Sequence, residues 1–149
     1  QYVQYNKTIK KPSNPKRSKY IFCGWYSDSK LTKAWNFNNK ITSGKTLYAK
    51  WKKISLKKAT ISKMQNVSGR KLKVTVKKVS GADGYQIQYS TKSNMKSAKN
   101  VSSSKTTTTI SKLSKGKKYY VRVKAYKKDS TGKKVAGKWS KVKNLKVSK

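Results

Sequence analysis

LSKGKKYYVRVKAY, residues 113–126, carries the clearest structural signal in this 149-residue chain. From Tyr119 onward the side chains alternate with a period of two, so they fall on two sides of an extended backbone. The apolar side holds Tyr119, Val121, Val123 and Ala125, and the polar side holds Tyr120, Arg122, Lys124 and Tyr126. The pattern predicts a β-strand with one face turned toward a core.

The residues that lead into this strand carry a second signal. Leu113, Gly116 and Tyr119 are spaced in a way that resembles the tyrosine corner of Greek-key β-sandwiches. In that motif the tyrosine hydroxyl bonds to upstream backbone, and the resemblance implies that the leucine plugs the end of the sandwich. We therefore assign structural roles to these three residues.

Further strand signals recur at sandwich spacing on both sides. The expected strands are 59–64, 70–77 with Leu72, Val74 and Val76 inward, one with Tyr85, Ile87 and Tyr89 inward after the turn VSGADGY, 105–110, and a last strand ending near Val147. With the tyrosine corner on the next-to-last strand, residues 53–149 resemble a fibronectin type III-like domain, which implies a seven-stranded β-sandwich. The family's usual tryptophan is replaced by Val76, and Trp139 is expected to fill part of that volume.

The first third of the chain carries a different set of motifs. Prolines at 12 and 15 precede YIFCGWYSD (20–28), W-x-F (35–37) and TLYAKW (46–51). The arrangement resembles the internalin-type B repeat of bacterial surface proteins over residues 1–52, which implies a small β-grasp-like module with structural roles for Trp25 and Trp51. The repeat's first strand is missing and Ser18-Lys19 replaces its usual glycine, so we expect an incomplete module with an open edge. Cys23 is expected to be a small buried hydrophobe.

The charge balance is extreme. The chain has 40 Lys or Arg against three acids, with no Glu and no His, and its net charge is +37. Residues 1–52 carry 12 bases and one acid, and residues 53–149 carry 28 bases and two acids, so both modules are basic. Lysine abundance alone describes a solvated surface, whereas depletion of acids favours a surface that faces polyanions.

The same composition argues against catalysis and against bound metal or cofactor. General acid–base chemistry needs a group that titrates near neutrality or a pair of carboxylates, and this chain has only three separate Asp residues. A metal site needs clustered His, Cys or carboxylate ligands. No run of 18 apolar residues is present, so we expect no membrane insertion. We therefore expect a protein that is not an enzyme and has no cofactor.

Candidate binding residues follow from the outward phase of the expected strands. Lys71, Lys73 and Lys77 on one sheet, with Arg122 and Lys124 on the other, are the expected polyanion contacts. Tyr120, Tyr126, Gln86 and Gln88 are expected to form an exposed aromatic and polar face, which is either an ordinary sheet surface or domain contact, or a platform on which a sugar ring can stack. Lysine acts as a diffuse point charge, and only three arginines are present, so sequence-specific nucleic-acid recognition is not expected.

The paired resemblances imply a non-catalytic segment of a secreted or cell-surface protein, associated with the cell wall of a Gram-positive bacterium. Its expected role is adhesion or display, through non-specific docking on anionic cell-wall polymer such as teichoic acid, on sulfated host glycan, or on extracellular DNA. One alternative is a purely architectural stalk or spacer that presents neighbouring domains of a parent protein. A second alternative is a cationic nucleic-acid-binding or antimicrobial protein, which has the charge but no amphipathic basic helix.

Overall fold

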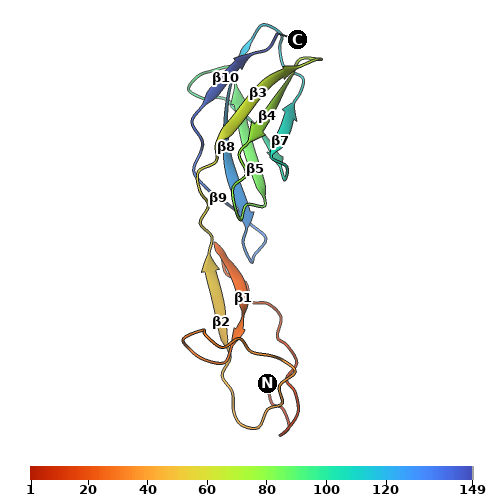
Figure 1. The fold of residues 1–149 in the computed structure, drawn as a ribbon, viewed down its shortest axis with the longest axis vertical. Helices are drawn as coiled ribbons and strands as arrows, with labels where there is room; N and C mark the ends of the chain where they lie inside the picture. Colours follow the sequence, from red (N-terminus) through yellow and green to blue (C-terminus); the bar gives the residue numbers. More distant parts are fainter. Residues whose placement is uncertain (149) are drawn as a thin grey trace. The chain divides into compact units, whose positions relative to one another are not determined.

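The computed structural model describes residues 1–148, and these form two compact units (Figure 1). The first unit comprises Gln1–Ile54 with Asp129–Lys133, and the second comprises Ser55–Lys128 with the residues from Lys134 onward. The regular elements in the described residues are all strands, which confirms the expectation of a mainly β chain. No helix in this part of the chain is long and apolar enough to cross a membrane.

The first unit is built on one antiparallel ladder. β1 (Tyr20–Tyr26) pairs with β2 (Tyr48–Lys53), and the register shifts between Phe22 and Trp25. Gly24 lies in that shift at a φ of 114°, which L side chains rarely adopt. Within the described residues β2 pairs with β1 alone, so its other edge is open.

Aromatic side chains pack around this ladder. The ring of Phe22 meets Trp25 edge-on at 5.4 Å between centroids and Trp51 at 5.5 Å, which gives both tryptophans the structural role expected of them. Packing is light, because every fully buried apolar side chain in the described residues belongs to the second unit. The expectation that Cys23 is buried is wrong: it is exposed, whereas the other residues of β1 are half-buried.

The second unit is a two-layer sandwich. One sheet contains β3 (Ile61–Val67), β4 (Lys71–Val76) and β7 (Thr107–Ile110), in the order β3-β4-β7. The other contains β5 (Gly84–Ser90), β6 (Lys99–Ser103), β8 (Lys118–Lys128), β9 (Lys134–Ala136) and β10 (Lys143–Lys146), in the order β10-β8-β5-β6 with β9 also paired to β8. Figure 1 shows β3, β4 and β7 lying over β5 and β8, and the core fills the space between the two sheets.

The core has the alternation that the sequence predicts. Leu72, Val74 and Val76 of β4 are buried against Val121 and Val123 of β8, and all five are at most 3% exposed. Such close packing of branched side chains is the main source of stability in a domain of this size.

Two tyrosine hydroxyls tie loops to the ends of the sandwich. The N–H of Ser114 donates to Tyr119 at 3.1 Å, and Leu113 is buried beside it, so the tyrosine corner is confirmed. The N–H of Val79 donates to the hydroxyl of Tyr85 at 2.8 Å, a bond that the sequence did not predict.

Two features of the second sheet differ from expectation. β6 was not anticipated, and the last strand is divided into β9 and β10. Between these two pieces, Ser140 satisfies the backbone of Val123: its N–H donates to the carbonyl at 2.7 Å and its Oγ accepts from the N–H at 3.0 Å. The expectation that Trp139 fills core volume is also wrong, because the neighbouring Ser140 is the residue that turns inward.

Candidate functional site

The three carboxylates of the chain are all hydrogen-bonded to backbone. Each aspartate lies outside the strands and accepts at least one backbone N–H group, from its own loop or from a segment far away in the sequence. The shortest of these bonds come from Lys33 to Asp28 at 2.7 Å, from Lys128 to Asp83 at 2.8 Å, and from Lys19 to Asp129 at 2.7 Å. The three acids of this chain therefore serve as acceptors for backbone N–H groups.

These bonds lower the pKa of each aspartate, because they stabilise the ionised form. The backbone N–H of Lys33 is the main cause for Asp28, and that of Lys128 is the main cause for Asp83. The hydroxyl of Thr131, at 2.6 Å, is the main cause for Asp129 and, with backbone N–H groups, lowers its pKa to about 2. Carboxylates held ionised in this way are poorly suited to proton transfer near neutral pH.

The cations are almost entirely without counter-charge. Within residues 1–148 the one ion pair joins Lys127 to Asp83 at 3.1 Å. The same residues contain no group of three or more His, Cys, Asp or Glu side chains close enough to hold a metal ion. The surface field of the second unit is therefore one of uncompensated lysine charge.

The expected polyanion contacts lie on two different sheets. Lys71, Lys73 and Lys77 lie on or just after β4, where Lys73 and Lys77 are exposed and Lys71 is half-buried. Arg122 and Lys124 lie on the outward face of β8, in the opposite sheet. The structure thus brings together the β8 pair and the β4 lysines separately and does not join them into one patch.

Strand register adds two glutamines to the β8 pair. Arg122 lies opposite Gln88 of β5, and Lys124 lies opposite Gln86. The Nε of Arg122 donates to Oε1 of Gln88 at 2.8 Å. Because cross-strand neighbours on one face are the closest side-chain partners in a sheet, this bond fixes the direction of the guanidinium.

Trp139 completes this face, although the sequence reasoning placed it in the core. The guanidinium carbon of Arg122 lies 4.6 Å from the indole centroid, and Nζ of Lys124 lies 4.4 Å from it. Both distances are typical of cation–π contacts. Strand periodicity could not predict this position of Trp139, because the last strand is interrupted between β9 and β10. We call Arg122, Lys124, Trp139, Gln86 and Gln88 the β8 face.

The two tyrosines expected on this face differ from each other. Tyr120 is half-buried and lies opposite Ser90. Tyr126 does not form part of an exposed surface, because it is only 9% exposed. The ring of Tyr126 covers Gly84, its partner on β5. Nζ of Lys134, a residue of β9, lies 4.4 Å from the centroid of this ring.

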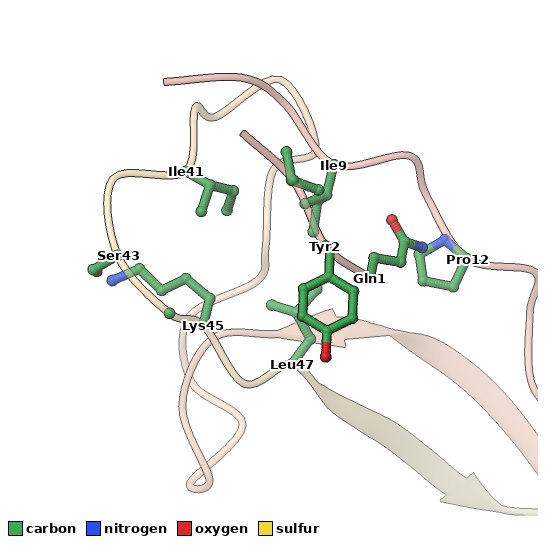
Figure 2. A pocket seen from close by; sticks show the side chains of 10 residues that line it. Gln1, Tyr2, Ile9, Pro12, Ile41, Ser43, Lys45 and Leu47 are labelled. Atoms are coloured by element: carbon green, nitrogen blue, oxygen red, sulfur yellow. The ribbon is translucent and has the colours of Figure 1, made fainter. Parts of the chain in front are cut away.

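The first unit offers an apolar hollow. A cavity of about 370 Å³ is lined by residues of the N-terminal segment and of the loop before β2. Figure 2 shows Tyr2, Ile9, Ile41 and Leu47 around it. The hollow is open, and its lining combines these apolar side chains with the polar side chains of Gln1, Ser43 and Lys45.

Comparison with known proteins confirms both resemblances inferred from the sequence. Residues 1–50 match the Listeria-Bacteroides repeat domain, and residues 58–138 match the fibronectin type III domain.

Two bacterial proteins are similar to this chain over 50 residues. They come from Evansella cellulosilytica and are named "Putative Gly-rich membrane protein", at 44% identity, and "Putative membrane protein", at 42% identity. The match covers 33% of this chain in both comparisons, but only 6% of the first protein and 8% of the second. The chain thus corresponds to a small part of these relatives.

Solved structures agree on the sandwich. The FN1-FN3 domains of chicken CNTN1 superpose with a TM-score of 0.54 at 20% identity, covering 78% of this chain and 41% of that one. The sixth fibronectin type III domain of human fibronectin type III domain containing protein 3 superposes with a TM-score of 0.51 at 17% identity, covering 65% of this chain and 90% of that one. At these identities the comparison speaks for the fold alone.

Proposed function

This chain belongs to the fibronectin type III domain family, and from that premise we propose that it is a non-catalytic segment of a secreted, wall-associated bacterial surface protein that docks on anionic polymers. Repeat and fibronectin type III domains fit a cell-surface module or spacer. The proposal adds a ligand class to that description: teichoic acid, sulfated glycan or extracellular DNA, attracted without sequence specificity.

One observation carries the proposal. All three carboxylates bond to backbone amides in turns, while 40 basic residues share a single described ion pair. A solvated surface without a binding role has no reason to lose acids everywhere except where the backbone needs an acceptor. Such a pattern is what a surface that must not repel polyanions requires.

The chemistry of the cations favours binding to many kinds of anionic polymer over recognition of one specific sequence or structure. Thirty-seven of the 40 bases are lysines, whose compact ammonium attracts phosphate or sulfate without the bidentate geometry of arginine. Binding should therefore be driven by release of counterions from the polymer.

The test is binding to heparin, poly(glycerol phosphate) and double-stranded DNA by isothermal calorimetry between about 50 and 400 mM NaCl. We expect all three to bind, with log Kd rising steeply and linearly against log salt concentration. A variant with eight exposed lysines changed to glutamine should show a shallower slope. Affinity that is unchanged across the salt series, or absent at the lowest salt, would contradict the proposal.

The second candidate is an architectural spacer, favoured by the complete sandwich core of the second unit. In that role the lysines serve solubility, and polyanions should give no thermal stabilisation beyond that of simple salt at matched ionic strength. Melting curves with each polymer at fixed ionic strength therefore separate the two candidates.

A further inference from the structure

A basic hollow lies at one end of the second unit, apart from the β8 face. Its volume is about 220 Å³, and its lining includes Tyr89, Lys92, Lys96, Lys99, Lys112 and Tyr119. These residues come from the end of β5, the following loop, the start of β6, the segment after β7 and the start of β8. We call this set the lysine hollow.

The loop that forms the lysine hollow is held in place from within. Ser90 is buried, and its Oγ accepts from the N–H of Lys92 at 3.1 Å and donates to the carbonyl of Lys96 at 2.8 Å. Met95 anchors the loop, since its side chain is only 8% exposed. The hydroxyl of Ser90 thus bonds to the backbone of this loop, in which the side chain of Met95 is buried. No carboxylate is needed to hold the loop in this conformation.

Asp83, the acid of the second unit, lies far from the hollow. Asp83 precedes β5, whereas the hollow lies where β5 ends, seven residues or about 20 Å further on. In the described residues none of the four lysines of the hollow takes part in an ion pair. The lining of the hollow therefore carries four positive charges and no negative one.

The hollow also has an aromatic wall. Tyr89 is half-buried, and its ring lies 6.3 Å from that of Tyr119 between centroids. Tyr119 and Leu113 are buried and close the bottom of the hollow. An aromatic face suits the C–H face of a sugar ring, and amphipathic tyrosine tolerates its hydroxyls. At about 220 Å³ the space is below the range of about 300–1,000 Å³ of sites for drug-sized ligands, so it accepts a single small unit.

We propose that the lysine hollow binds one sugar unit that carries a sulfate or phosphate ester, with Tyr89 against the ring and the four lysines around the ester oxygens. The inference rests on the proposed function and deepens it. Most of the basic surface would attract a polyanion without specific contacts, and the lysine hollow would be a specific binding site for one monomer of that polymer.

The first test uses small ligands with one anionic group, because the lysine-rich surface as a whole attracts such ligands only weakly. Glucose 6-sulfate and glucose 6-phosphate are titrated into ¹⁵N-labelled protein, with glucose and inorganic sulfate as controls. We expect saturable amide shifts confined to residues 89–99 and 112–119 with at least one ester, and shifts at least about fivefold weaker at equal concentration with either control, because both ring and charge are needed. Which ester binds more tightly identifies the source of the anion.

The second test compares two variants with the same loss of charge. Lys96→Gln with Lys112→Gln removes one lysine from each side of the hollow, and Lys63→Gln with Lys105→Gln removes two exposed lysines elsewhere on the same unit. We expect the hollow variant to bind the preferred ester about tenfold more weakly, and the control variant to stay within about twofold of the parent chain. Melting temperatures and dispersed amide spectra establish that both variants fold.

The outcomes separate this inference from the proposed function. If heparin binds in a salt-dependent way but both esters give only diffuse, non-saturating shifts, or the two variants behave alike, the lysine hollow is refuted and the general surface stands. If an ester saturates the hollow and the hollow variant loses it, the site stands, even if heparin does not bind and the proposed function fails.

Discussion

Gly84 and Tyr126 face each other across the ladder between β5 and β8, and the tyrosine ring occupies the space that a side chain at Gly84 would need. A Cβ atom at Gly84 would lie 2.7 Å from the hydroxyl oxygen of Tyr126 and 2.6 Å from the carbonyl oxygen of Ser103. The glycine therefore lets an outward-phase tyrosine lie flat on the sheet and become buried.

Gly84→Ala should destabilise the second unit by about 1–3 kcal/mol, since the clash with the Ser103 carbonyl involves backbone and cannot be relieved by a rotamer change. Urea unfolding followed by tryptophan fluorescence measures the loss. Gly44→Ala is the control, because a Cβ there meets nothing within 4 Å. An unchanged midpoint for Gly84→Ala would contradict the packing described.

The two tyrosine hydroxyls that bond to backbone should contribute different amounts to the free energy of unfolding. Tyr85→Phe leaves the buried N–H of Val79 without an acceptor and should cost about 1–3 kcal/mol. Tyr119→Phe should cost less, about 0.5–1.5 kcal/mol, because Ser114 is exposed and its N–H can turn to water. Denaturant unfolding of both variants, with Tyr120→Phe as a control, ranks them, and the reverse order would be inconsistent with this account.

Acid should remove the contribution of Asp129. Its pKa in the folded chain is about 2, below the ordinary value of 3.8, so the unfolded chain takes up its proton first. The stabilisation is present above about pH 4 and is lost as the pH falls from about 4 toward 2. Asp129→Asn should therefore be less stable than the parent at pH 7, with the difference shrinking in that window. Melting temperatures of both proteins from pH 7 to pH 2 test this, and a constant difference would argue against it.

The β8 face should bind polyanions better than the β4 lysines do. Arg122→Gln with Lys124→Gln removes cations that Trp139 and Gln88 hold in place, and should weaken heparin binding by about tenfold at low salt. Lys71→Gln with Lys73→Gln removes the same charge from β4 and should cost about twofold to threefold. Calorimetry on both variants decides, and equal losses would mean that total charge alone matters.

Cys23 should react in the native protein. Because its side chain is exposed, a maleimide should label it within about tenfold of the rate in denaturant, whereas a buried thiol would be protected far more strongly. Cys23→Ser should leave the melting temperature unchanged. Labelling followed by mass spectrometry is the measurement, and protection of the native thiol would restore the buried role that the sequence suggested.

Sequence reasoning was strongest where one period governs many residues. The alternation in β4, β5 and β8 predicted which side chains are buried, and the resemblance of residues 113–119 to a tyrosine corner predicted a bond between the Tyr119 hydroxyl and upstream backbone, which Ser114 provides. It failed where a local contact overrides the period. Tyr126 follows the outward phase, yet it is buried because Gly84 leaves room for its ring.

Other features left no periodic trace. Ser140 substitutes for regular pairing opposite Val123, so nothing in the sequence showed that Trp139 would turn toward Arg122. Lys19 stands where the repeat usually has glycine, and the structure gives it a φ of 67°, so the backbone keeps the glycine-like turn although the residue has changed. The lysine hollow was also missed, since its residues come from three separate segments.

The turns that hold the three aspartates have a further consequence. The chain contains no histidine and no glutamate, and the pKa values of its three aspartates are lowered. Acidification from pH 7 to pH 5 therefore leaves the charge of its side chains unchanged. Attraction to a phosphorylated or sulfated polymer that also stays ionised would persist through such a change. If the proposed function holds, binding to such a polymer should therefore be the same at pH 7 and at pH 5, whereas a histidine- or glutamate-rich surface would change its charge over this range.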